Sequence, residues 1–300
     1  MGFKLGVALG GGGVRGLAGI GAIQALADAG MAPDIVAGTS MGAIVGALYA
    51  ESQDIGRTRE IVCGTLGSEE FLKKARRLSS SDDEKGFFEQ IYGKARKGYL
   101  FYRFLFMKSM IPPEAFFTEM DRFIPDRDFS ELRLPFACIA LDLVTGYPTI
   151  LRSGSVRQAV RASSSVPGIL PPVEIGACRY VDGGWAERVP VSAASVLGAD
   201  FVLGVDVSRD ISPIDYEEEI ENSMDALFRA DDIARTLMNT LRTANADFVV
   251  YPEVGDAGWS DFRNIEDYIE SGRRAVTRAI PVLKRAMRFR RAGRLLWKRR

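Results

Sequence analysis

The chain has 300 residues, 47% of them hydrophobic, which is enough to bury the core of one sizeable α/β domain, with or without a helical insert. Lys and Arg together number 39, as do Asp and Glu, so a formal net charge of zero favours no class of charged partner. The chain contains no histidine, which excludes every Ser-His-Asp or Cys-His mechanism and every zinc site with a histidine ligand. A nucleophilic enzyme of this composition needs a carboxylate, a lysine or a metal ion to accept the proton.

The charges are distributed unevenly along the chain. Residues 271–300 hold twelve Lys or Arg and no Asp or Glu, whereas the first 270 residues hold 27 basic and 39 acidic side chains, a net charge of −12. An acidic body with a basic tail favours a local anionic partner, such as a membrane surface. We expect no nucleic-acid-binding surface spread over the fold.

The cysteines and apolar segments predict a soluble protein of a reducing compartment, the cytoplasm. Cys63, Cys138 and Cys178 are odd in number and far apart, so their spacing builds neither a disulfide framework nor a CxxC metal site. The N-terminal segment lacks the charged region of a signal peptide and is interpreted as a first strand. Residues 98–111 are apolar, but they include charges and are too few to span a bilayer.

The first fifty residues predict a β-α-β-α unit, which favours a parallel sheet. The expected elements are a strand at 4–9, a helix at 17–29 with Gly30 as its C-cap, a strand at 35–38 and a helix at 41–50. Residues 51–130 lack β alternation and are expected to form a helical insert that covers the sheet. The aromatic residues between 99 and 106 suit either an acyl-chain groove or ordinary core packing.

Further strands are expected in the second half of the chain, at 136–143, 149–152, 180–181, 201–207 and 247–251. The acidic segment 209–222 predicts a surface loop that leads into a helix. From Arg273 onward, apolar residues recur at helical spacing among basic ones, which predicts an amphipathic tail helix with a kink or break near Pro281. The apolar positions are Val276, Ile280, Leu283 and Met287.

A glycine-rich motif follows the first strand and opens the first helix. Its residues are Gly11, Gly12, Gly13, Val14, Arg15 and Gly16. Consecutive glycines before a helix can direct several N–H groups at one anion, either a phosphate or the oxyanion of a tetrahedral intermediate. The letters also satisfy the GxGxxG dinucleotide pattern, but no acid ends the second strand, and no Lys-Ser/Thr follows as in a P-loop. Alone, the motif fits a structural turn as well as an anion site.

A GxSxG motif lies between the second strand and the second helix. Its residues are Gly38, Thr39, Ser40, Met41 and Gly42. Small residues here permit a tight strand-to-helix turn that projects the Ser40 hydroxyl, although a serine N-cap has the same letters. The two motifs follow adjacent strands of a parallel sheet and should open at the same edge. This context favours Ser40 as a nucleophile that faces the glycine N–H groups.

A third motif, made of Asp182, Gly183 and Gly184, follows a predicted strand. Such a turn can bring a carboxylate close against another backbone, although Asp-Gly is also a common plain turn. Asp142 and Asp206 also lie near the ends of predicted strands. Spacing alone does not choose among these three aspartates as the base that would serve Ser40.

Taken together, these motifs resemble the patatin-like phospholipase family, especially its compact bacterial members. The matching segments are 11–16, 38–42, 161–172 (RASSSVPGILPP), 182–184, 190–191, 198–200 and 205–207. The resemblance covers roughly residues 5–207 and implies an α/β fold whose mainly parallel sheet is sandwiched by helices in three layers. With the composition of the other segments, the expected organisation is this domain with a helical insert at about 51–130, then a continuation of the same domain at 208–270 and a basic amphipathic helical tail at 271–300.

The resemblance implies a serine lipid acyl hydrolase of the phospholipase A, lysophospholipase or carboxylesterase type, with a Ser-Asp dyad of Ser40 and Asp182. It also implies an oxyanion hole from the Gly12 and Gly13 amides, with Arg15 beside it. Such a dyad explains how a GxSxG enzyme can lack histidine. The expected partner is a lipid or acyl ester, and no metal or cofactor is expected. For residues 271–300 two interpretations stay open: a basic amphipathic helix that binds the anionic inner face of a membrane, or a solvated helix packed on the body.

Two other classes of function stay open at this point. One is a catalytically silent scaffold on the same fold, although the intact Ser40 and Asp182 argue against it. The other is a nucleotide-binding oxidoreductase that would use the glycine loop. Many relatives have Asp-Gly-Gly-Gly in that loop, whereas Leu9 and Gly10 precede it here, outside the residues expected to carry the chemistry.

Overall fold

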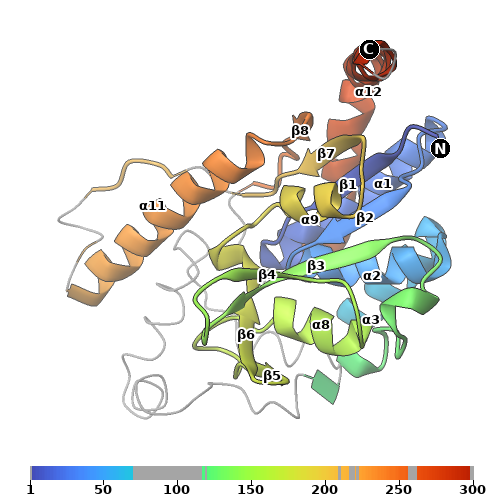
Figure 1. Cartoon of the computed structure of the whole chain (residues 1–300). Coiled ribbons are helices and arrows are strands. Elements are labelled where there is room, and N and C mark those ends of the chain that lie inside the picture. Colours follow the sequence, from blue (N-terminus) through green and yellow to red (C-terminus); the bar gives the residue numbers. More distant parts are fainter. Residues whose placement is uncertain are drawn as a thin grey trace.

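The computed structural model describes residues 2–69, 117–118, 120–208, 211–215, 220, 223–255 and 262–297 (Figure 1). Within these residues a sheet of eight strands has the order β5-β6-β3-β2-β1-β7-β8, with β4 paired to β3. The strands are β1 (Leu5–Leu9), β2 (Ile35–Gly38), β3 (Phe136–Asp142), β4 (Pro148–Leu151), β5 (Val173–Ile175), β6 (Cys178–Asp182), β7 (Phe201–Val205) and β8 (Phe248–Val250). The pairs β1–β2, β1–β7, β2–β3 and β7–β8 are parallel, and β4, β5 and β6 add antiparallel pairs at the β3 end.

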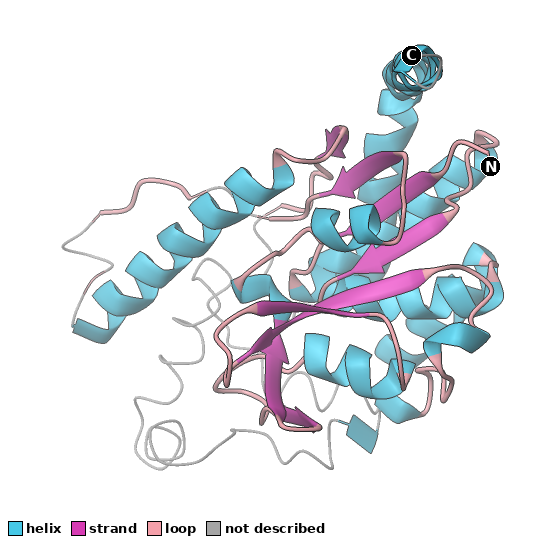
Figure 2. Ribbon diagram, viewed as in Figure 1, coloured by secondary structure: helices cyan, strands magenta, loops and turns pink. Residues whose placement is uncertain are grey.

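Helices lie on both faces of this sheet (Figure 2). They are α1 (Ala18–Asp28), α2 (Met41–Ser52), α3 (Ile55–Leu66), α8 (Val156–Ser163), α9 (Val191–Val196), α11 (Ser223–Thr243) and α12 (Ile265–Trp297). Short 3-10 helices occupy Gly13–Leu17, Phe129–Glu131, Gly183–Trp185 and Phe262–Asn264. The predicted fold class, a mainly parallel sheet between layers of helices, is confirmed.

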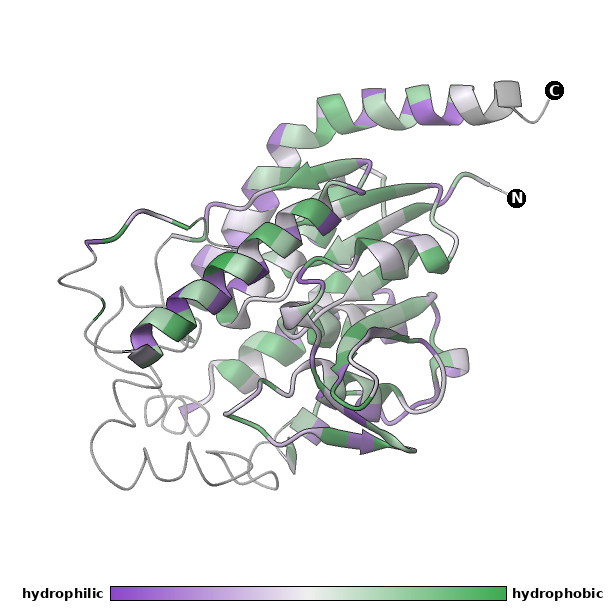
Figure 3. Cartoon of the chain, turned by 60° about the vertical axis from the view of Figure 1, so that its left-hand side comes forward, coloured by the Kyte–Doolittle hydropathy of each residue, from purple (hydrophilic) through white to green (hydrophobic). Residues whose placement is uncertain are grey.

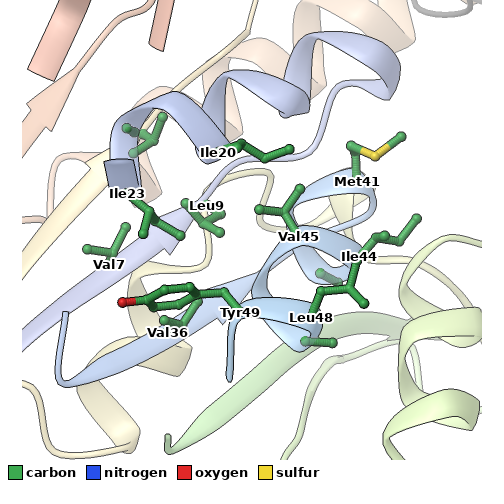
Figure 4. Packing of buried hydrophobic residues seen from close by; sticks show 14 of the residues in the cluster. Val7, Leu9, Ile20, Ile23, Val36, Met41, Ile44, Val45, Leu48 and Tyr49 are labelled. Carbon is green, nitrogen blue, oxygen red and sulfur yellow. The ribbon is translucent and has the colours of Figure 1, made fainter. Parts of the chain in front are cut away.

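The core forms because side chains alternate between the two faces of each strand. Leu5, Val7 and Leu9 of β1 are buried on one face, among apolar residues of α1, α2 and α12. Figure 4 shows Val7 and Leu9 close to Ile23 of α1. This larger cluster fixes β1 and β2 against their helices, and the first two sequence motifs begin where these strands end.

The opposite face of the sheet is lined by small residues, which lets α9 approach closely. Ala8, Ala37 and Ala137 lie on neighbouring strands and pack in one cluster with Val191 and other residues of α9. Large side chains at these positions would push the helix away from the sheet. The small residues therefore hold the segment after the Asp-Gly-Gly turn near the glycine loop.

Most elements predicted from the sequence are present. The predicted strands correspond to β1, β2, β3, β4, β6, β7 and β8, and Gly30 follows α1 with φ +69°. The Met31 N–H donates to the Leu26 carbonyl, which completes the predicted C-cap. Strand β5 and the helices α8 and α9 were not predicted.

Helix α12 begins at Ile265, before the predicted start, and continues through Pro281. The apolar positions predicted for it pack on the core: Val276 and Leu283 are fully buried, and the other two are partly buried. Its close approach to α1 depends on Gly21, where a Cβ atom would lie 1.7 Å from the Ile269 carbonyl oxygen. Figures 1 and 3 show the helix changing direction toward the C-terminus.

Part of the predicted insert and of the acidic loop lies outside the described residues. Helix α3 falls within the insert, whereas the aromatic run at 99–106, expected to line an acyl-chain groove, is not among the described residues. The predicted boundary at residue 271 falls inside α12. Among the helices that the structure describes, none is long and apolar enough to cross a membrane.

Candidate active site

The strand register brings the three motifs to one edge of the sheet. Leu9 pairs with Gly38, so the glycine loop and Ser40 leave adjacent parallel strands at the same level. Gly38 also pairs with Cys138 of β3, and two residues further along β3 Ala140 pairs with Asp182. Because β6 runs antiparallel to β3, it starts outside this edge of the sheet and runs back toward it. Its last residue, Asp182, therefore lies at the level of Ser40.

Ser40 lies in a strained turn between β2 and α2. Its φ of 55° and ψ of −123° are unusual for a residue with a side chain, and such strain is found mainly at functional sites. The motif glycines permit the turn, because a Cβ at Gly38 would lie 2.2 Å from the Gly42 carbonyl oxygen. Although Ser40 occupies the N-cap position of α2, its side chain makes no capping hydrogen bond, so the alternative of a plain serine cap is wrong.

A buried serine on α8 fixes the backbone of this turn. The Ser163 hydroxyl accepts the Ser40 N–H at 3.0 Å and donates to the Ile139 carbonyl of β3 at 2.6 Å. Ser163 is fully buried, so both of its partners would be left unsatisfied without it. Ser163 therefore ties the strained turn to the central sheet.

The carboxylate of Asp182 lies against Ser40. Asp182 is 3% exposed and accepts the Gly184 N–H at 2.7 Å, and the Ser40 hydroxyl lies close enough to lower the pKa of Asp182 as a hydrogen-bond donor. Burial disfavours the charged carboxylate and raises the pKa of Asp182 to about 6, although these hydrogen bonds and the charges of Arg188 and Arg235 oppose the shift. The result is a carboxylate whose pKa lies much closer to neutral pH than that of a free aspartate.

The two rival aspartates have other partners. Asp142 accepts hydrogen bonds from the Val144 N–H at 3.0 Å, the Thr145 hydroxyl at 2.9 Å and the Arg179 N–H at 3.2 Å. Burial would raise the pKa of Asp142, but these hydrogen bonds outweigh it and hold the pKa at about 2. Asp142 thus stabilises the turn between β3 and β4.

Asp206 follows β7 on the other side of the site. One of its carboxylate oxygens accepts the Ser208 N–H at 2.9 Å, and the other accepts the Asn239 amide of α11 at 3.1 Å. Of these three aspartates, Asp182 is the one that lies beside the Ser40 hydroxyl, whereas the hydrogen bonds of Asp142 and Asp206 come from other residues. The geometry therefore distinguishes the candidates that spacing left open.

The glycine loop packs directly on Ser40. A Cβ at Gly11 would lie 3.0 Å from the Ser40 Cβ, and the Gly11 N–H donates to the Arg188 carbonyl at 3.0 Å. The Arg15 Nε donates to the Gly12 carbonyl at 3.2 Å. Since that carbonyl shares a planar peptide with the N–H of Gly13, this bond fixes the direction in which the N–H points.

The residues just after the Asp-Gly-Gly turn accept hydrogen bonds from the other two motifs. The sequence did not indicate that these residues have this role. The Glu187 carbonyl accepts the Thr39 hydroxyl at 3.0 Å, beside the bond from the glycine loop to the Arg188 carbonyl. Helix α11 contacts the same segment, with the Arg235 guanidinium 4.7 Å from the centre of the Trp185 ring. The only sequence signal for these residues is their closeness to Asp182 along the chain.

In the part of the chain that the structure describes, no group of three or more His, Cys, Asp or Glu could hold a metal ion. Cys63, Cys138 and Cys178 are free thiols. A serine hydroxyl, a buried carboxylate and backbone N–H groups meet at this edge of the sheet. Such a set can perform acyl transfer.

Comparison with known proteins identifies the family of the chain. The model of the family described as patatin-like phospholipase matches residues 7–195. An uncharacterised NTE family protein of Mycobacterium tuberculosis is 28% identical over 93% of this chain and 47% of its own length. Lysophospholipase nte1 of Aspergillus oryzae is 29% identical over 76% of this chain and 13% of its own length. The chain thus spans half or less of the length of these curated relatives.

A solved structure has the same fold. The crystal structure of VipD from Legionella pneumophila matches with a TM-score of 0.50 and 14% identity, over 94% of this chain and 67% of that one. The chain belongs to the patatin-like phospholipase family, because the family model covers well over half of it. This membership replaces the dinucleotide-binding interpretation of the glycine loop.

Proposed function

We propose that the chain is a serine lipid acyl hydrolase of the phospholipase A, lysophospholipase or carboxylesterase type. The observation that carries the proposal is the position of the buried Asp182 carboxylate beside the Ser40 hydroxyl, which lies at a strained strand-to-helix turn. It supplies a nucleophile and its base in a chain that has no histidine. The same contact argues against a catalytically silent scaffold.

In the first half of the reaction, the Ser40 oxygen attacks the acyl carbonyl carbon while Asp182 accepts the hydroxyl proton. The N–H groups of Gly12 and Gly13 stabilise the oxyanion of the tetrahedral intermediate. Collapse of the intermediate breaks the ester bond, and the departing alcohol takes the proton from Asp182. The products of this half are the free alcohol and an acyl ester on Ser40.

In the second half, water attacks the acyl-Ser40 carbonyl and gives its proton to Asp182. The new intermediate collapses to a fatty acid, and the Ser40 oxygen regains the proton. A carboxylate with a pKa of about 6 removes a proton more readily than a free aspartate with a pKa near 3.9. Arg15 contributes by holding the Gly12 carbonyl, which keeps the Gly13 N–H available for the oxyanion.

We take lysophospholipids as the first substrates to test, because the Aspergillus relative is named a lysophospholipase. The purified chain should release fatty acid from lysophosphatidylcholine, and Ser40→Ala should remove the activity. A Ser40→Ala variant that is as active as the wild type would refute the proposal. A chain that is inactive on both lysophosphatidylcholine and a soluble p-nitrophenyl ester would also refute it.

We further propose a cytoplasmic protein whose tail makes peripheral contact with the anionic inner face of a membrane. Because the apolar side of α12 packs on the body, this contact would be electrostatic and made by exposed arginines near the end of the helix, such as Arg285, Arg288 and Arg291. Binding to anionic vesicles should then fall as salt is raised. It should also fall when residues 285–300 are removed, and salt-independent binding would contradict the proposal.

A further inference from the structure

Helix α11 has two faces of opposite character. Its polar face turns toward the candidate site through Arg235, Asn239 and Arg242, which are spaced as i, i+4 and i+7. Arg235 lies over Trp185, the Asn239 amide donates to Asp206, and the Arg242 guanidinium lies 3.8 Å from the Glu187 carboxylate. The helix is therefore held by its polar side.

The opposite face of α11 is apolar and exposed along most of the helix. Its large side chains are between 37% and 70% exposed. They are Leu227, Ile233, Leu237, Met238 and Leu241. Figure 3 shows apolar residues recurring along this helix.

No charged residue interrupts this apolar face, because the described charged side chains of α11 lie on its other sides. Asp231 and Asp232 pair with Arg235, Arg229 donates to the Ser212 carbonyl, and Asp225 is buried. A helix that faces water normally has the reverse arrangement, with its apolar side packed inward. The exposed side of α11 therefore matches an apolar phase better than it matches water.

We propose that this apolar face of α11 docks on the surface of a lipid bilayer or micelle. The inference rests on the proposed function, because a lipid ester is presented at such a surface and α11 contacts the turn that carries Asp182. The five side chains present an apolar area on the order of 500 Å², which is large enough for a functional patch. It is smaller than the about 800 Å² that each partner buries in a stable protein complex, so a lipid surface fits better than a second copy of the chain.

The test compares the full chain with the variant Leu237→Gln/Leu241→Gln in sedimentation with uncharged phosphatidylcholine vesicles at high salt. Glutamine keeps the helix propensity and removes the apolar contact. The matched control is Val196→Gln, an exposed apolar residue of the helix α9. Neutral vesicles and high salt separate docking by α11 from electrostatic attraction by the basic tail.

We expect the double variant to bind these vesicles at least about tenfold more weakly than the wild type, with Val196→Gln unchanged. Hydrolysis of a soluble p-nitrophenyl ester should stay within about twofold in both. The proposal is wrong if the double variant binds like the wild type, or if the wild type does not bind. It is also wrong if the apolar face proves to hold a dimer that dissociates in the double variant.

Failure of this inference is distinguishable from failure of the proposed function. Vesicle binding is measured without turnover, so it can succeed or fail whether or not the chain cleaves an ester. A wild type that hydrolyses the soluble ester but does not bind vesicles contradicts the docking surface alone. A wild type that binds vesicles but cleaves no ester contradicts the proposed function.

Discussion

Two buried aspartates sit at the ends of the paired strands β6 and β3 with opposite electrostatics. Asp182 has a pKa raised to about 6, because burial dominates over its few hydrogen bonds. Asp142 has a pKa held at about 2, because one hydroxyl and two backbone N–H groups donate to it and outweigh burial. The same residue type thus becomes a candidate base in one turn and a fixed structural charge in the other.

This difference shows that the number of donors around a carboxylate, rather than burial alone, decides which role it can take. A carboxylate that is fully satisfied by donors has little tendency to accept another proton. One that is desolvated but retains a bond to a serine hydroxyl can accept the proton of that serine. The following variants test this contrast between Asp182 and Asp142.

The largest effect should come from the matched pair Asp182→Asn and Asp142→Asn. An amide at 182 cannot accept the Ser40 proton, so kcat on a soluble ester should fall by about 10³-fold or more. The Asp142 variant should retain kcat within about twofold for the folded protein. Equal losses in the two variants, with both folded by circular dichroism, would remove the distinction between the aspartates.

An intermediate effect is expected for Ser163→Ala. Loss of the bond to the Ser40 N–H should relax the strained turn and lower kcat by about 10- to 100-fold, with KM nearly unchanged. The control is Ser165→Ala, because the Ser165 hydroxyl donates to the Arg161 carbonyl and not to Ser40. A control variant as impaired as Ser163→Ala would show that the loss reflects general damage to this segment.

The pH profile should reveal the raised pKa of Asp182. Only the ionised carboxylate accepts a proton, so kcat/KM for a soluble ester should fall as pH decreases through about 6. Arg235→Gln should move this apparent pKa upward, because the positive charge of Arg235 lowers the pKa of Asp182. A flat profile down to pH 4.5 would contradict the assignment of Asp182 as base.

The smallest expected effect is on the thermal stability of the protein, to which the charged Asp142 carboxylate contributes through its turn. Because its pKa is lowered from 3.8 to about 2, the charged form stabilises the fold above pH 3.8, and this contribution is lost as pH falls through about 2. Asp142→Asn should therefore lower Tm at pH 7, and its difference from the wild type should shrink below pH 4. A difference in Tm that stays constant from pH 7 to pH 3 would contradict the lowered pKa of Asp142.

The fold class and the position of the candidate nucleophile could be predicted because they depend on local patterns. The glycines around Ser40 are required by backbone contacts of 2.2 Å, and a strand that alternates with a helix twice favours parallel pairing. Parallel strands end at one edge, so the glycine loop and Ser40 could be expected together. These inferences need only short stretches of sequence.

The candidate base and the residues around it could not be predicted from short stretches of sequence. Asp182 reaches Ser40 only through the antiparallel register between β3 and β6, and the donors to Asp142 include the distant Arg179. Ser163 acts through a bond that spans 123 positions of the chain. Strand β5 was missed because three residues carry too little alternation to be detected.

Labelling with a fluorophosphonate probe tests the central claim most directly, because the probe reacts only with an activated serine. Intact-mass measurement should show a single adduct on the wild type and on Asp142→Asn, none on Ser40→Ala and strongly slowed labelling of Asp182→Asn. Peptide mapping should place the adduct on Ser40. An adduct that persists in Ser40→Ala, or labelling of Asp182→Asn at the wild-type rate, would contradict a Ser40–Asp182 dyad.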